Sequence, residues 1–110
     1  MTKELKCMIN IGFFSEMNIS MHNNGSIKDH IVSSVSYDKD KVIKYLDSFG
    51  RQAICPREAI DCVTGKVIAS SFAVNDDGEY CWPDFLSYHL RKYNIKLPKG
   101  FIKIINDKTV

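Results

Sequence analysis

The sequence predicts a small single-domain α+β fold, an antiparallel sheet of about four to five strands packed with about two to three helices. Its 110 residues suit one compact domain, and 45% hydrophobic with 25% charged residues is ordinary globular composition. Two segments carry apolar residues at helical spacing, and β-branched residues bounded by turn formers lie between them. No repeat or linker divides residues 1–110, so we expect one domain.

The first third of the chain carries two predicted strands separated by an irregular segment. Residues 6–14, KCMINIGFF, form an apolar and partly β-branched run that is typical of a buried strand. Residues 15–30 show no clean period and include the turn formers HNNGS, which predicts a loop. Residues 31–37, IVSSVSY, resume a strand pattern. We therefore expect two strands with a loop or irregular excursion between them.

Residues 38–80 predict one helix followed by a hairpin. Asp38 can cap a helix over DKDKVIKYLDSFG, and Gly50 can end it. The apolar residues at helical spacing in this segment are Val42, Leu46 and Phe49. Residues 51–80 then change to β-branched residues between turn signals, which predicts two or three short antiparallel strands. The best hairpin candidate is residues 59–74, in which Gly65 supplies the positive φ of the reversal.

The last part of the chain predicts two helices. Pro83 stands where a first helical residue belongs, and Asp84 places negative charge on the amide-rich helix N-terminus. The residues that recur at helical spacing after it are Phe85, Leu86, His89, Leu90 and Tyr93. Pro98 opens a short final helix, whose apolar residues are Phe101, Ile102 and Ile105. Between strand and helix, residues 76–78 form a turn and Trp82 anchors the helix entrance against the core.

Charge and cysteine usage narrow the possible classes of function. A net charge of +2 is too small to mark a nucleic-acid-binding domain or an acidic nucleic-acid mimic. No apolar run approaches the roughly 20 residues of a membrane-spanning helix, and no secretion signal is present. Cys7, Cys55, Cys62 and Cys81 lack the close pairing of a zinc site. We expect a cytoplasmic protein with reduced thiols, no metal and no cofactor.

Three segments carry a resemblance to a known family. KVIKYLDSFG, AIDCVTGKVIASSF and NDDGEYCWPDFLSYHLRKYNIKLPKGFIKII resemble, in this order, small bacterial immunity proteins of contact-dependent growth inhibition and polymorphic toxin systems. The resemblance covers about residues 40–105, and its most specific part is the spacing from the acidic glycine turn to the tryptophan and the last proline. Tyr80 stands where the family has a tryptophan, and Gly100 where it has an acid.

The resemblance implies an antitoxin that binds and neutralises a cognate toxin domain, the C-terminal domain of a secreted effector and commonly an RNase or DNase. Because a nuclease cleft is generally basic, an acidic surface on the inhibitor would complement it. Asp76, Asp77, Glu79 and Asp84 lie close together in sequence with no Lys or Arg between them. Tyr80 is an amphipathic side chain of the kind that dominates interfaces, and Asp61 could add to the patch if the hairpin folds over the turn. The expected partner-binding residues are therefore Asp61, Asp76, Asp77, Glu79, Tyr80 and Asp84.

Two other classes of function remain as alternatives. The first is a small nucleic-acid-binding domain, because the C-terminal third is basic with interleaved aromatic residues. Its residues are Arg91, Lys92, Lys96, Lys99, Lys103 and Lys108, with Tyr88, Tyr93 and Phe101. The second is an enzyme with a Mg²⁺ site and a histidine base. Its candidates are Asp61, Asp76, Asp77 and Glu79, with His22, His30 or His89. No known catalytic spacing connects these residues, so we expect no enzyme activity.

Overall fold

A computed structural model of the protein describes residues 9–18, 24–49 and 51–108. In these residues the chain forms three α-helices, a four-stranded mixed sheet and a two-stranded sheet, which confirms the predicted α+β class. The elements are β1 (Ile9–Asn10), the 3₁₀ helices η1 (Ser15–Met17) and η2 (Ile27–Asp29), α1 (Lys39–Asp47), β2 (Arg51–Cys55), β3 (Ala59–Ile60), β4 (Val67–Ala69), β5 (Phe72–Asp76), β6 (Tyr80–Pro83), α2 (Leu86–Lys92) and α3 (Lys99–Lys108).

The main sheet has the strand order β1-β6-β5-β2. β5 pairs antiparallel with both β2 and β6, whereas β1 pairs parallel with β6 through Ile9 opposite Tyr80. The sheet is mixed because β1 and β6 are joined by most of the chain, and a long connection permits a parallel pair that a tight turn does not. β3 and β4 form a separate hairpin, in which Gly65 takes a φ of 79°, as predicted.

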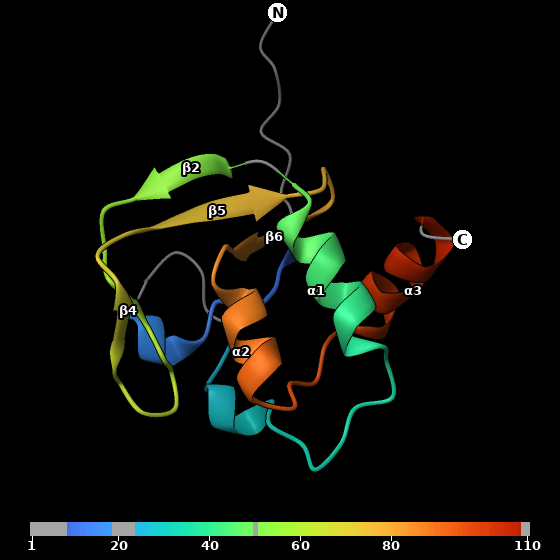
Figure 1. The fold of residues 1–110 in the computed structure, drawn as a ribbon, viewed down its shortest axis with the longest axis horizontal. Helices are drawn as coiled ribbons and strands as arrows, with labels where there is room; N and C mark the ends of the chain where they lie inside the picture. The colour runs from blue at the N-terminus through green and yellow to red at the C-terminus, as the bar shows by residue number, and fades with distance from the viewer. Residues whose placement is uncertain (1–8, 19–23, 50, 109–110) are drawn as a thin grey trace, which may run out of the picture.

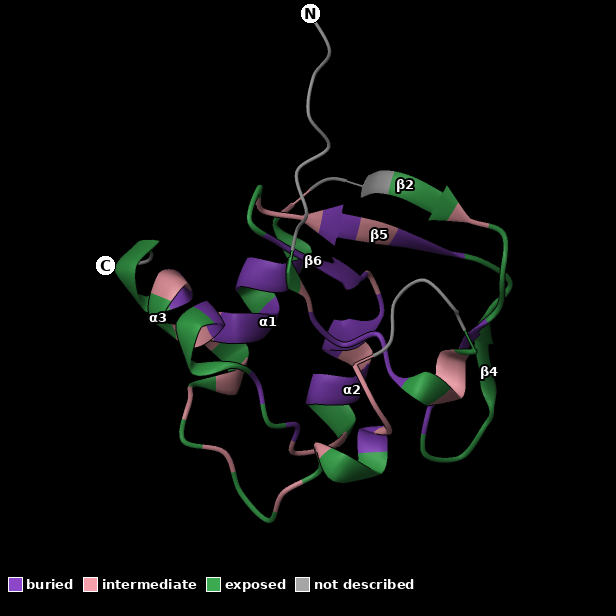
Figure 2. Ribbon diagram, turned by 180° about the vertical axis from the view of Figure 1, so that it is seen from behind, coloured by how far each residue is buried: buried purple, intermediate pink, exposed green. Residues whose placement is uncertain are grey.

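The three α-helices lie together on one side of the sheet, and the β3–β4 hairpin and α3 lie at opposite sides of the molecule (Figure 1). The buried residues line the inner faces of the helices and β6, while β2 and β4 are largely exposed (Figure 2). Trp82 is 1% exposed and contacts the rings of Tyr45, Phe49 and Phe101, so the predicted anchor in the core is confirmed. None of the helices described has the length and apolar character needed to cross a membrane.

The helix predicted from residue 38 is confirmed as α1. The Asp38 carboxylate accepts a hydrogen bond from the Lys41 N–H at 3.2 Å, which is the expected N-cap. Val42 and Leu46 are buried and Phe49 packs against the core, while Gly50 lies outside the described residues. Local spacing and capping chemistry therefore account for this element.

The strand predicted over residues 6–14 is present only as β1. Residues 6–8 lie outside the described part of the chain, and the strand ends at Asn10. Gly12 then takes a φ of 76°, which ends the extended pleat, and a Cβ on this glycine would lie 2.7 Å from the Leu86 side chain. The chain therefore turns inward against α2 instead of continuing along β6.

The prediction of a strand over residues 31–37 is wrong. This segment makes a single bridge, between Ile31 and Ile95, and is otherwise irregular. Its closest neighbour is the connection between α2 and α3, to which it is joined by the Val32 N–H bond to the Asn94 carbonyl at 2.9 Å. An alternating apolar pattern forms a strand only where a second strand is available to pair with it, and none lies here in the described residues.

The expectation that Pro83 is a first helical residue is also wrong. Pro83 is the last residue of β6, opposite Val74 of β5. The Asp84 N–H donates to the Ala73 carbonyl at 2.8 Å and keeps the chain bound to β5 for one more residue. α2 therefore begins only at Leu86. The last helix begins as predicted, at the residue after Pro98, and buries Phe101 and Ile105 completely.

The burial of the described cysteines predicts which thiols react in the native protein. Cys55, Cys62 and Cys81 are free, and only Cys55 is not buried. Burial and the charges of Glu16 and Asp61 raise the pKa of Cys62 to about 12, and burial with nearby carboxylates also raises that of Cys81. Native alkylation near about pH 8 should label Cys55 and spare the two buried thiols, since the thiolate is the reactive form. Peptide mass spectrometry measures this, and equal labelling of all three would contradict it.

Candidate functional site

The candidate site is the acidic turn, defined here as residues 76–79, which joins β5 to β6. Asp76 is the last residue of β5 and lies opposite Cys81. The Asp77 N–H donates to the Tyr80 carbonyl at 3.1 Å, and Gly78 takes a φ of 95°. This left-handed conformation strongly favours glycine, so the DDG sequence determines the reversal.

Asp77 holds the acidic turn in one conformation. Its Oδ1 accepts hydrogen bonds from the N–H groups of Glu79 at 2.9 Å and Tyr80 at 2.7 Å. Its Oδ2 accepts one from the Tyr45 hydroxyl of α1 at 2.8 Å. Burial, and then the bond to Asp77, raise the pKa of Tyr45, so this phenol remains a donor. The acidic turn is therefore fixed to α1 and its geometry is preorganised.

Asp76 and Glu79 supply the free negative charge of this site. The Asp76 Oδ1 accepts the Gly78 N–H at 3.0 Å, and Glu79 is exposed. Neither carboxylate forms an ion pair with any residue in the described ranges. Lys108 is a cation that lies nearby in the described part of the chain, since its Nζ donates to the Tyr45 hydroxyl at 3.4 Å and lies over its ring. Among the described side chains, the turn therefore presents two carboxylates that no cation pairs with.

Two residues expected in the acidic patch lie elsewhere. Tyr80 is buried, with its ring against Phe101, because β6 is an inner strand of the sheet and all four of its residues are buried. A Cβ on Gly100 would lie 2.9 Å from the Tyr80 hydroxyl, so this side chain reaches the start of α3. Asp84 comes directly after β6, whereas the acidic turn comes directly before it, so the two lie at opposite ends of this strand. Neither residue extends the exposed acidic surface.

Asp61 also lies away from the acidic turn. It follows β3 in the hairpin, which Figure 1 places at the opposite side of the molecule from α3. Its side chain is fully buried against α2. The expectation that the hairpin brings Asp61 to the patch is therefore corrected: the hairpin folds over α2, and the carboxylate is enclosed beneath it.

The Asp61 carboxylate is saturated with hydrogen bonds. Its Oδ1 accepts from the N–H groups of Val63 at 2.9 Å and Thr64 at 3.1 Å. Its Oδ2 accepts from the Tyr88 hydroxyl at 2.8 Å and the Lys92 Nζ at 3.1 Å, and the Tyr93 hydroxyl reaches both oxygens. Burial alone would raise the pKa of this carboxyl group, but these hydrogen bonds together lower it below its ordinary value.

His89 and Cys62, two titratable residues beside Asp61, are both buried. The His89 Nε2 accepts the Cys62 N–H at 2.9 Å, and burial lowers the pKa of this imidazole. The Cys62 thiol remains protonated because its pKa is about 12. His30 lies elsewhere, with its Nδ1 3.0 Å from the Ser26 carbonyl, and His22 is outside the described residues. In the described chain no group of three or more potential ligands is placed to hold a metal ion.

The basic residues expected for nucleic-acid binding are partly committed to internal contacts. Lys92 binds Asp61, Arg91 pairs with Asp47 of α1 at 3.0 Å, and Lys103 pairs with Asp107 along α3. Phe101 is fully buried and cannot stack on a base. The arrangement is that of charges on the outer faces of amphipathic helices.

The sequence interpretation missed the support that α1 provides. Tyr45 was not singled out, although it joins Asp77 to the core, and its only sequence signal is its place beside Leu46 in the helical pattern. The partners of Asp61 were also missed, although Tyr88 and Lys92 are spaced by four residues and so share a helix face. In comparisons with known proteins, no family model, no curated protein and no solved structure matches this chain.

Proposed function

We propose that this protein is an immunity protein, a cytoplasmic antitoxin that binds and neutralises the toxin domain of an effector delivered by neighbouring bacteria. It acts by occupying the toxin, catalyses no reaction and needs no cofactor. The observation that carries the proposal is the acidic turn, a rigidly held reversal that presents two carboxylates, the half-buried Asp76 and the exposed Glu79, which form no ion pair with the described residues. The order of the sequence segments that resemble immunity proteins supports it independently.

A nuclease domain is the kind of toxin that this surface fits best. Nuclease clefts bind polyphosphate and are therefore basic, so two free carboxylates on a fixed turn complement them. Because Asp77 already holds the turn through three hydrogen bonds, little conformational entropy is lost when the turn binds. An inhibitor of a toxin that kills at few copies needs nanomolar affinity or better, about −12 kcal/mol, over a contact of roughly 1,600 Å².

The decisive experiment reverses the two free acids and leaves Asp77 in place, because Asp77 supports the fold. The variant Asp76→Lys/Glu79→Lys should bind the toxin at least about 100-fold more weakly, since like charges across an interface cost several kcal/mol. Its melting temperature should fall only slightly, because Glu79 is exposed and Asp76 contributes one hydrogen bond to the turn, from the Gly78 N–H, of a kind worth about 0.5–1.5 kcal/mol.

The binding partner for this measurement is the C-terminal domain of a large secreted effector encoded beside this gene. Calorimetry gives the dissociation constant, and a toxicity assay in cells gives the protection. The matched control is Asp29→Lys/Glu58→Lys, which reverses two exposed acids outside the turn and should bind normally. If the turn variant binds as tightly as this control, the acidic turn is not the contact surface.

A further inference from the structure

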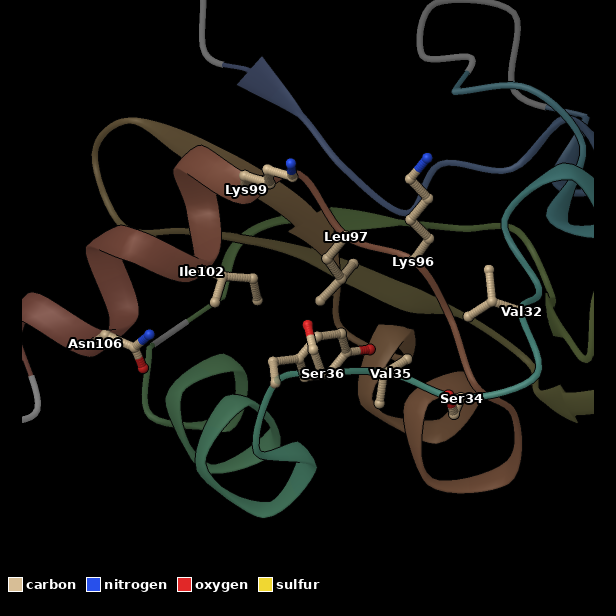
Figure 3. Close-up of a pocket in the computed structure, with 10 residues that line it drawn as sticks. Val32, Ser34, Val35, Ser36, Lys96, Leu97, Lys99, Ile102 and Asn106 are labelled. Carbon is tan, nitrogen blue, oxygen red and sulfur yellow. The ribbon is translucent and has the colours of Figure 1, made fainter.

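A groove lies between residues 31–37 and the start of α3, and no part of the proposed function uses it. It has a volume of about 440 Å³. Figure 3 shows Leu97 and Ile102 facing the segment that carries Val35, so the floor is apolar. Ser34 and Ser36 lie along one side, and Lys96 and Lys99 lie along the other. The groove therefore combines an apolar floor with polar edges, which is typical of a binding site.

The segment that forms one side of the groove is held in place by hydrogen bonds at both ends. Asn94 donates its side-chain N–H to the Ser33 carbonyl at 2.9 Å. The Tyr37 hydroxyl donates to the Ile95 carbonyl, and the Lys39 Nζ donates to the Tyr93 carbonyl at 3.1 Å. The groove is thus already formed in the free protein, and a ligand does not have to order it.

Between these fixed ends the main chain is available to a partner. Among the described residues, no hydrogen bond engages the N–H or carbonyl groups of Ser34, Val35 and Ser36. Free main-chain groups beside an apolar floor are the features with which proteins bind extended peptide segments. The groove runs along α3 from Lys99 to Asn106, seven residues or about 10 Å. This length matches about three extended residues at roughly 3.3 Å each.

The charge of the groove determines the kind of segment that fits it. Lys96 and Lys99 are exposed and form no ion pair with the described residues, and no Asp or Glu lines the groove. A nucleic acid would need exposed aromatic rings for stacking, whereas the one ring here, Tyr37, is fixed by its bond to Ile95. We propose that this groove binds an extended acidic segment of a partner protein, with carboxylates on the lysines and alternate apolar side chains on the floor.

This inference does not rest on the proposed antitoxin function, because the groove and the acidic turn share no residue. It can be tested with a phage-displayed library of twelve-residue peptides, selected on the intact protein. Selection should enrich acidic peptides with apolar residues at alternate positions. Their affinity should fall at least 10-fold in Lys96→Glu/Lys99→Glu, and it should weaken as salt screens the contact. Fluorescence polarisation with labelled peptides gives these affinities.

Two further variants make the test specific. Val35→Arg places a large side chain in the groove and should block the same peptides, because Val35 lines it. Lys28→Glu/Lys66→Glu reverses two exposed lysines that lie outside the groove and form no ion pair with the described residues, and it should bind the peptides as the wild type does. The proposal is overturned if no acidic peptide is enriched, if the enriched peptides bind all variants equally, or if RNA oligonucleotides compete for the groove more strongly than the peptides.

Discussion

Replacing Trp82 with alanine is expected to lower the free energy of unfolding by about 3–5 kcal/mol, the usual cost of a large-to-small change in a core. The side chain is 1% exposed. It contacts three aromatic rings, those of Tyr45 in α1, of Phe49 just after α1 and of Phe101 in α3. Its removal would therefore leave a cavity between the sheet and two helices. Urea unfolding followed by circular dichroism measures the change.

The control for this prediction is an exposed apolar residue of the same sheet. Ile54 of β2 is 61% exposed, so Ile54→Ala should change the free energy of unfolding by about 0.5 kcal/mol or less. A Trp82→Ala variant as stable as Ile54→Ala would show that the ring is not part of the core. Trp82 would then belong to the surface, where it could contact a partner.

Replacing Asp61 with asparagine is expected to lower the free energy of unfolding by a similar amount, about 3–5 kcal/mol. This is the typical effect of removing one partner of a buried charged network. An amide offers one acceptor oxygen where the carboxylate offers two. The backbone donors of Val63 and Thr64 and the hydroxyls of Tyr88 and Tyr93 would then compete for it. Matched urea unfolding curves measure the difference from the wild type.

The matched control is Asp47, an exposed carboxylate that also pairs with a cation of α2. The Arg91–Asp47 bridge is 3.0 Å long with both side chains well exposed, and exposed bridges contribute about 0–1 kcal/mol. Asp47→Asn should therefore have little effect. If the two variants are equally stable, the enclosed network around Asp61 contributes no more than a surface ion pair.

The effect of Asp61→Asn should also depend on pH in a specific direction. Because the folded-state pKa of Asp61 is lowered, its stabilising contribution is complete above the unfolded pKa of about 3.9 and is lost as the pH falls through the folded-state value. The difference between wild type and variant should therefore be constant from about pH 7 to pH 5 and smaller at about pH 3. A difference that grows as the pH falls would contradict this sign.

Where local chemistry decides the structure, the sequence was sufficient. α1 follows from its apolar spacing and the Asp38 cap, and the hairpin reversal follows from a glycine that takes positive φ. Residues 31–37 and Pro83 were misplaced because their conformations depend on partners distant in sequence. Residues 31–37 have no second strand beside them in the described chain, and pairing with β5 holds Pro83 in β6.

The sequence by itself determined that residues 76–79 form a tight acidic turn, because the side chains of Asp76 and Asp77 bond to N–H groups two and three residues ahead. Only the tertiary structure decided which acids remain at the surface. Asp61 is enclosed by Tyr88 and Tyr93, which are 27 and 32 residues away in the sequence. In the described part of the chain, Asp76 and Glu79 have no such distant partner. A carboxylate is enclosed only where folding brings enough donors to replace its water, and such long-range encounters leave no local pattern in a sequence.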